Sequence, residues 1–311
     1  MIKLLALTGP TATGKTALSV RLAKALNGEI ISGDSTQVYR GMDIGTAKVT
    51  EEEMEGVPHH LIDVLDIKDP FSAGAFAETA GEIAEGIHAR GRVPIIAGGT
   101  GLYIDALTGG RMLSETADSN ASVRESLMAK AEREGAEALH SYLETIDPTS
   151  AAEIHPNNVK RVARAIEIYL VTGKTKTELN SEKREQTRFK RLLFVLSSPD
   201  RDYLYRRINQ RVDLMVEAGL LNEAEELYKM GIGDTPTAGQ AIGYKEFFPY
   251  FEGRCTLEDS VEKVKQATRN YAKRQITYFK RMEDAVFLDC TEPKDVLFER
   301  AFSMAKEFLN D

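Results

Sequence analysis

The stretch Gly-Pro-Thr-Ala-Thr-Gly-Lys-Thr at residues 9–16 matches the pattern G-x-x-x-x-G-K-[ST] of a phosphate-binding loop. It follows an apolar run at 4–7 and precedes a segment whose apolar residues recur at helical spacing. In this order of strand, loop and helix, backbone N–H groups and a helix N-terminus surround a phosphate. A glycine turn that only joins a strand to a helix would not need every fixed position of the pattern. We therefore expect a phosphate site in which Lys15 adds a charge and the Thr16 hydroxyl can hold Mg²⁺.

Strand patterns alternate with helical patterns through the first hundred residues and return towards the C-terminus. Such alternation is typical of a parallel sheet covered by helices on both faces. The sequence predicts an α/β fold with a P-loop NTPase-like parallel sheet flanked by helices. We expect strands at 1–7, 29–32, from 92, 191–199 and 285–289, an extended segment or strand at 59–66, helices at 76–90, 201–218, 220–229 and 257–282, and a polar turn at 231–244.

Only helical patterns occur between residues 113 and 191, at 122–134, 135–144, 149–154 and 157–172. Because a strand follows at 191–199, these helices are predicted to form an all-helical domain inserted into the α/β fold. The catalytic core is then 1–112 and 190–311, and it includes the basic helix near the C-terminus. The helical insertion is 113–189.

Basic residues are concentrated in two windows, although the chain of 311 residues carries a formal net charge of −8. Residues 263–281 contain seven Lys or Arg and no acid, and residues 155–191 contain ten Lys or Arg against four acids. The rest of the chain is therefore strongly acidic. A basic docking surface on an acidic body fits a nucleic-acid partner, although solvated helix faces have the same composition.

The two cysteines, Cys255 and Cys290, are too few and too far apart for a zinc site or a disulfide framework. No apolar run approaches the length of a membrane span, and the short run before the phosphate loop is a buried strand rather than a signal peptide. We expect a cytoplasmic monomer with no membrane partner.

The acidic residue that kinases and nucleotide hydrolases place at the end of a later strand is missing after 92–98, where glycines and Thr100 follow. The nearest acid is Asp34, after the strand 29–32. The carboxyl ends of neighbouring parallel strands face one crevice, so the phosphate loop, Asp34 and Thr100 should meet there. A phosphate cradle beside a carboxylate suits a transfer reaction in which a phosphate leaves and the carboxylate takes a proton from the nucleophile.

The chain resembles the tRNA dimethylallyltransferases, also called tRNA isopentenyltransferases, nearly from end to end. The resemblance rests on GPTATGKT, SGDSTQVYRGMDIGTAK, PHHLID, AGGTGLY, IHPNNVKRVARAIEIY, RINQRVDLM, AIGYKEF and ATRNYAKRQITYFKR. It implies transfer of a dimethylallyl group from dimethylallyl diphosphate to N6 of adenosine 37 in tRNAs that read codons beginning with U. The products are N6-isopentenyladenosine and diphosphate, the cofactor is Mg²⁺, and the partner is the tRNA anticodon stem-loop.

The resemblance also implies which residues act. The diphosphate of the prenyl donor is bound by Gly9, Pro10, Thr11, Ala12, Thr13, Gly14, Lys15 and Thr16. Asp34 is similar to the family's general base, Thr100 orients it, and Arg211 reaches the diphosphate beside Lys15. An N-capping Asp, a turn Thr and a surface helix Arg are the ordinary alternatives for these three. His59 and His60 are expected to serve packing or substrate orientation.

Further residues are implied to bind the tRNA, whose target base must be flipped out of the anticodon loop to reach such a site. They are Asp34, Ser35, Thr36, Gln37, Thr100, Arg124, Lys160, Arg161, Val162, Ala163, Arg164, Gly239, Gln240, Ala241, Ile242, Gly243, Tyr244, Lys245, Lys273, Arg274 and Gln275.

Three alternatives stay open at the level of sequence. A prenyltransferase acting on free AMP, ADP or ATP would use the same loop but leave the basic windows without a role. A nucleoside or shikimate-type kinase would need the missing strand-end acid. An RNA-binding module without activity would not need a phosphate loop beside Asp34.

Overall fold

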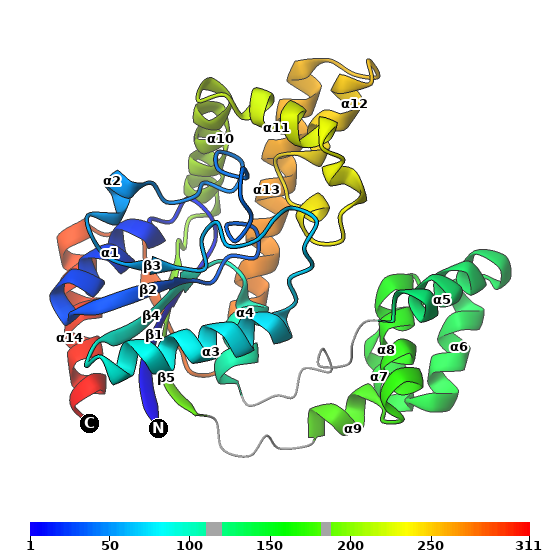
Figure 1. The fold of residues 1–311 in the computed structure, drawn as a ribbon, viewed down its shortest axis with the longest axis horizontal. Helices are drawn as coiled ribbons and strands as arrows, with labels where there is room; N and C mark the ends of the chain where they lie inside the picture. The colour runs from blue at the N-terminus through cyan, green and yellow to red at the C-terminus, as the bar shows by residue number, and fades with distance from the viewer. Residues whose placement is uncertain (110–119, 182–187) are drawn as a thin grey trace. The chain divides into compact units, whose positions relative to one another are not determined.

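The computed structural model describes residues 1–109, 120–181 and 188–311. The described residues divide into two compact units (Figure 1). One contains 1–71, 76–108 and 188–311, and the other contains 72–75, 109 and 120–181. The first predicted boundary, at 112 and 113, lies outside the described residues. At the second, the core resumes at residue 188 rather than 190, because the strand that follows already begins at Phe189.

The first unit is built on a six-stranded sheet in which every neighbouring pair is parallel. The strand order is β3-β2-β4-β1-β5-β6, so β1 and its phosphate loop lie inside the sheet, between β4 and β5. The predicted α/β fold with a parallel sheet is confirmed. The strands are β1 Ile2–Thr8, β2 Gly28–Ser32, β3 His59–His60, β4 Val93–Gly98, β5 Phe189–Ser197 and β6 Ala285–Asp289.

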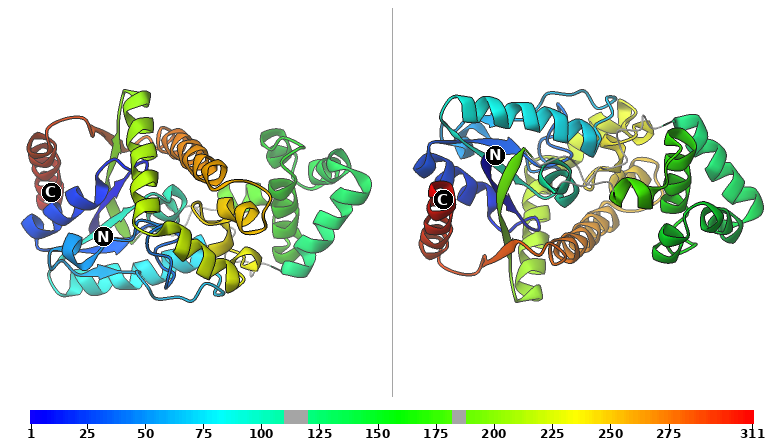
Figure 2. Two further views of the ribbon diagram at one scale, coloured as in Figure 1. Left: turned by 90° about the horizontal axis from the view of Figure 1, so that it is seen from above. Right: turned by 90° about the horizontal axis from the view of Figure 1, so that it is seen from below.

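Helices cover both faces of the sheet, because successive strand residues point to opposite sides and both sides are apolar. Figures 1 and 2 show α1 (Lys15–Leu26) and α14 (Lys294–Asn310) on one face, and α3 (Ala73–Ala89) and α4 (Gly101–Thr108) on the other. On the first face Leu5 of β1 belongs to one buried cluster with residues of α1 and α14. The sheet is thus closed on both faces, and ligands can approach only its edges and ends.

A second apolar core lies beyond the carboxyl ends of the strands. It joins residues from the segment 38–67 to α10 (Arg201–Glu217), α11 (Leu220–Lys229) and α13 (Leu257–Phe279). The predicted polar turn at 231–244 is wrong, since this stretch buries apolar side chains in that core. It forms the short helical turns η2 Ile232–Asp234 and η3 Ala238–Gln240, and η4 Lys245–Phe247 and α12 Phe248–Phe251 follow directly along the chain. A further short helix, α2 Glu51–Met54, packs against α1.

Only two residues of the predicted extended segment 59–66 pair with the sheet. Leu61 and Asp63 adopt left-handed φ values of 60° and 55°, which a continuous strand does not allow. The chain therefore leaves the sheet after His60. The strand is nevertheless anchored, because the buried Glu29 of β2 accepts hydrogen bonds from His60 Nε2 at 2.7 Å and from Arg90 at 2.8 Å.

The described part of the second unit contains five helices around its own small core. Leu139, Leu143, Val162 and Ile166 are fully buried in that core. The helices are α5 Ala121–Glu134, α6 Ala136–Ile146, α7 Pro148–Glu153, α8 Val159–Thr172 and α9 Lys176–Ser181. The first four were predicted to within a few residues, and the short α9 was not. No described helix in either unit combines the length and apolarity needed to cross a membrane.

Candidate active site

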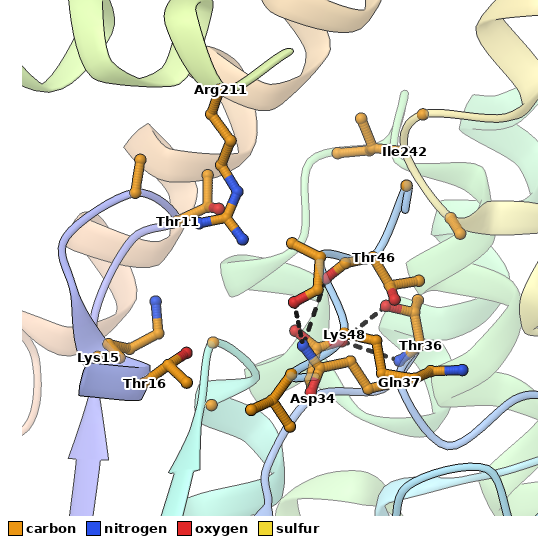
Figure 3. Close-up of a pocket in the computed structure, with 18 of the residues that line it drawn as sticks. Thr11, Lys15, Thr16, Asp34, Thr36, Gln37, Thr46, Lys48, Arg211 and Ile242 are labelled. Carbon is orange, nitrogen blue, oxygen red and sulfur yellow. Dashed lines mark hydrogen bonds between the residues drawn. The ribbon is translucent and has the colours of Figure 1, made fainter. Parts of the chain in front are cut away.

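A cavity of about 920 Å³ opens at the carboxyl ends of the strands (Figure 3). The phosphate loop and the segment after β2 line it from the sheet, and α10 and α13 line it from above. The sheet order explains the meeting, because β4 alone separates β1 from β2. Of the predicted site residues, the lining includes Thr11, Ala12, Gly14, Lys15, Thr16, Asp34, Ser35, Thr36, Gln37, Arg211, Gln240, Ala241, Ile242, Gly243, Lys245, Arg274 and Gln275.

The phosphate loop has the backbone of an anion cradle. Its φ values are positive at Gly9 (139°), Ala12 (64°) and Gly14 (89°). An added Cβ at Gly9 would lie 2.1 Å from the carbonyl oxygen of Leu196, so only glycine fits there. Throughout the described residues, no protein acceptor is found for the backbone N–H groups of 11–16. These unpartnered donors at the start of α1 are what a phosphate requires.

Two side chains of the loop complete the cradle. Lys15 Nζ donates to the Pro10 carbonyl at 2.6 Å, which holds the ammonium against the loop. Burial, reinforced by the positive charge of Arg211, lowers the pKa of Lys15 to about 8. The Thr16 hydroxyl points towards the cavity in Figure 3 and has no hydrogen-bond partner in the described chain. Thr13, in contrast, is buried, and its hydroxyl donates a hydrogen bond to the Pro10 carbonyl at 2.8 Å.

Two arginines of α10 reach the same region. Arg211 points from α10 into the cavity (Figure 3) and forms no ion pair with a described residue. Burial lowers the pKa of this guanidinium, and the negative charges of Glu53 and Asp34 offset only part of that effect. Arg207, one turn earlier, donates from Nε to the Ala12 carbonyl at 2.7 Å. Sequence reasoning did not assign Arg207 a role, although the i, i+4 spacing to Arg211 places both on one face of the helix.

The segment after β2 carries the predicted base. Asp34 Oδ1 accepts from the Thr36 backbone N–H at 2.9 Å and from the Thr36 hydroxyl at 2.7 Å. No described donor reaches its other oxygen, Oδ2. Thr100 does not line the cavity, but its Oγ1 accepts from the Ser35 backbone N–H at 3.2 Å, and its own N–H donates to Gly33. Thr100 therefore fixes the turn that carries Asp34.

The amide of Gln37 is held at both ends. Its Oε1 accepts from the Ser32 hydroxyl at 3.1 Å. Its Nε2 donates to the carbonyls of Thr46 and Ala47 at 3.3 and 3.2 Å. A base can therefore be read by Gln37 only in the orientation that these three partners set.

The predicted tRNA segments of the first unit differ in exposure. Gln240, Lys273 and Arg274 are exposed, Ile242 and Lys245 are half-buried, and Gly239, Ala241, Gly243, Tyr244 and Gln275 are buried. The Gln275 amide donates to the Gly99 carbonyl at 2.9 Å, so its side chain supports the turn before Thr100. Tyr271 of α13, which sequence reasoning missed, lines the cavity, and burial beside Asp34 raises its pKa to about 12.

In the second unit, the helix α8 exposes some side chains of the basic run at 160–164 and buries others. Lys160 and Arg161 are exposed, whereas Val162 and Ala163 are fully buried, so the side chains of these two cannot contact a nucleic acid. Arg164 and the predicted Arg124 both pair with Glu167, whose carboxylate is buried. Arg124 does so with two hydrogen bonds, of 3.0 and 3.1 Å.

A Mg²⁺ ion would find few protein ligands here. Among the described residues no group of three His, Cys, Asp or Glu could hold a metal. The donor set of the cradle is the free hydroxyl of Thr16 together with whatever oxygens a bound diphosphate brings. That set fits Mg²⁺, which keeps several waters and binds through substrate phosphates rather than in an all-protein cage.

Comparisons with known proteins identify the family of the chain. The family model described as IPP transferase matches residues 37–282. The chain belongs to the IPP transferase family. The tRNA dimethylallyltransferase of Bacillus subtilis (strain 168) is 51% identical over 290 residues, covering 93% of this chain and 91% of the relative. That of Halalkalibacterium halodurans is 48% identical over 307 residues, covering 99% and 96%.

Solved structures of the family have the same fold. The full-length tRNA isopentenylpyrophosphate transferase from Bacillus halodurans matches with a TM-score of 0.75 at 45% identity, covering 100% of this chain and 97% of that one. A eukaryotic dimethylallyltransferase acting on tRNA matches with a TM-score of 0.86 at 32% identity, covering 100% and 80%. The inserted helical region thus belongs to the family fold.

The lowered pKa of Lys15 predicts how diphosphate binding depends on pH. Below pH 8 the ammonium is charged and attracts the anion; above pH 8 it loses its proton, so the affinity falls by up to about tenfold per pH unit. Calorimetric titration with inorganic pyrophosphate between pH 7 and 9.5 measures this. In Lys15→Arg the guanidinium stays charged, so the dependence should flatten. Equal slopes in the two proteins would contradict the assignment.

Proposed function

We propose that this chain transfers the dimethylallyl group of dimethylallyl diphosphate to N6 of adenosine 37 in tRNAs that read codons beginning with U. The products are N6-isopentenyladenosine and diphosphate. The observation that carries the proposal is that an anion cradle and a carboxylate with one free oxygen line a single cavity. The name tRNA dimethylallyltransferase, which the similar proteins carry, supports the same reaction.

In the first half of the reaction, the bond between C1 of the allyl group and the diphosphate oxygen breaks. Negative charge then grows on the leaving diphosphate, and stabilising that charge is the main task of the protein. We assign this task to the N–H groups of 11–16, for which no acceptor is found among the described residues, and to Lys15 and Arg211. Arg211 is suited to it because its guanidinium forms no ion pair with any described carboxylate.

In the second half, N6 of the adenine bonds to C1 and must lose a proton. An exocyclic amine is a weak nucleophile because its lone pair is delocalised into the ring, so removing that proton during attack matters. Asp34 Oδ2 is the acceptor, since Oδ1 is already occupied by Thr36. Thr100 acts on this step through the turn that it fixes at Ser35 and through its hydrogen bond with Tyr271, which lines the cavity beside Asp34.

Mg²⁺ is part of the proposal, with Thr16 as the residue that would hold it together with diphosphate oxygens. When bound, the ion would neutralise part of the charge on the leaving group. The free hydroxyl of Thr16 beside the cradle supports this assignment.

The tRNA would be held by exposed cations in both units. Lys273 and Arg274 supply them beside the cavity, and Lys160 and Arg161 supply them on the helical insertion. Contacts of this kind go to phosphates and fix the register of the RNA, while base edges are read inside the site. We further propose that the protein acts as a monomer in the cytoplasm, as the sequence predicts.

Mass spectrometry of an anticodon stem-loop tests the reaction directly. Incubation with protein, Mg²⁺ and dimethylallyl diphosphate should add one dimethylallyl group at adenosine 37, and ATP in place of the prenyl donor should add nothing. Phosphorylated product with ATP alone would contradict the proposal. If free AMP were prenylated as fast as the stem-loop, the acceptor would be a free nucleotide rather than tRNA.

A further inference from the structure

Glu223, in the first turn of α11, holds a loop that lines the cavity. Its Oε2 accepts from the backbone N–H groups of Asp43 and Ile44 at 3.0 and 2.8 Å, and its Oε1 accepts from that of Gly45 at 2.9 Å. The Tyr244 hydroxyl donates to the same Oε1 at 2.8 Å. Three successive backbone N–H groups around one anion form a nest, the arrangement by which a loop wraps a charge.

The Glu223 carboxylate is held without a cation from the described part of the chain. No described Lys, Arg or His forms an ion pair with Glu223, so its four partners are all neutral donors. Hydrogen bonds to an ionised acceptor are stronger than neutral ones. The arrangement therefore fixes the loop rather than neutralising a charge. Tyr244 is buried and packs directly on Gly45, where an added Cβ would lie 2.5 Å from the ring.

The anchored loop continues into the partners of Gln37. Directly after Gly45, the carbonyls of Thr46 and Ala47 accept from Gln37 Nε2. Figure 3 shows Thr46, Gln37 and Asp34 on the same side of the cavity, across from Lys15. The Glu223 carboxylate on α11 therefore fixes Gly45, and the next two residues, Thr46 and Ala47, hold the amide of Gln37. Gln37 lies three residues after Asp34.

We propose that Glu223 is a positioning residue for the RNA substrate. It sets the loop 43–47 and, through it, the Gln37 amide that faces the incoming base. The inference rests on the proposed function for the identity of that base. Glu223 itself does not line the cavity, so its effect on the reaction is indirect.

Glu223→Gln tests the inference. A carboxamide keeps one acceptor oxygen and turns an NH₂ group towards backbone N–H donors, so at least one of the three loop N–H groups loses its partner. The KM for an anticodon stem-loop is expected to rise about 10- to 100-fold, the range for an unsatisfied buried donor. The KM for dimethylallyl diphosphate should stay within about twofold, because the phosphate loop is not touched.

The matched control is Glu225→Gln on the same helix. The Glu225 carboxylate pairs with Lys229 at 2.7 Å on the surface and does not contact the loop 43–47. Loss of such an exposed pair should leave both KM values within about twofold of the parent. Tyr244→Phe, which removes one of the four donors and leaves the nest, should raise the stem-loop KM less than Glu223→Gln does.

A cycle with Gln37→Ala separates positioning from general destabilisation. If Glu223 acts through Gln37, the effect of Glu223→Gln on the stem-loop KM shrinks when Gln37 is already Ala. An equal loss in both backgrounds, or an unchanged stem-loop KM, would overturn the inference.

Hydrogen exchange at Ile44 and Gly45 reports on the anchor without turnover. It should be faster in Glu223→Gln than in the parent, and protection equal to the parent's would overturn the inference even in an active enzyme. Absence of prenylation by the parent would instead count against the proposed function, so the two failures give different results.

Discussion

Asp34→Asn is expected to lower the rate of prenyl transfer by about 10²- to 10⁴-fold, the range for loss of a general base. The amide is the same size as the carboxylate and keeps one oxygen to accept from Thr36, so the turn after β2 should persist. What it cannot do is take a proton from N6. Single-turnover rates with a saturating stem-loop isolate this step from binding.

The binding of RNA provides the check on that experiment. Asp34→Asn should bind the stem-loop within about tenfold of the parent by fluorescence anisotropy, because at most one base contact is altered. Asp295→Asn, at an exposed carboxylate of α14 paired with Arg21, should leave the rate unchanged. A transfer rate within tenfold of the parent in Asp34→Asn would remove Asp34 from the role of base.

Arg211→Met is expected to have two opposite effects. The rate of transfer should fall about 10²- to 10³-fold, because one donor to the charge that develops on the diphosphate is lost. The melting temperature should rise, because burial disfavours a guanidinium that forms no ion pair with any described carboxylate and is only partly offset by the charges of Glu53 and Asp34. A residue whose removal stabilises the fold while it lowers activity is kept for function.

Stopped-flow transfer rates and thermal melting measure these two effects on the same protein. Arg206→Met serves as control, since this arginine lies on the same helix, is exposed, and has only a distant pair with Asp200 at 3.7 Å. It should change neither the rate nor the melting temperature appreciably. A lower melting temperature in Arg211→Met with an unchanged rate would show that Arg211 is structural.

In both basic windows, the number of Lys and Arg residues in the sequence overestimates the number of cations that are free to bind RNA. In the window 263–281, Lys265 pairs with Asp213 at 2.6 Å, and Arg269 pairs with Glu262 at 2.9 Å. In the window 155–191, Arg164 is paired with the buried Glu167. The acids that neutralise these cations lie outside the first window or on the buried side of the helix. Fewer cations are therefore available to RNA than the sequence suggests.

The sequence by itself determined the features that depend on short-range rules. The phosphate loop, the strand before it, the helix after it and the position of Asp34 directly after β2 all follow from patterns of fewer than about twenty residues. The parallel order of the sheet follows from the alternation of strands and helices. These rules place Asp34 and Lys15 at the same end of the sheet, and the strand order, in which β4 alone separates β1 from β2, brings them to one cavity.

Only the tertiary structure decided which distant groups meet. Ile44 and Glu223 are 179 positions apart, and Arg207 and Ala12 are 195 apart, yet each pair forms a short hydrogen bond. The same holds for the burial of Val162 and for Arg211, which lines the cavity and forms no ion pair with a described residue. Local pattern fixes the face that a residue occupies. What covers that face is fixed only when the whole core packs, because a side chain's partners come from whichever elements the close-packed interior brings against it.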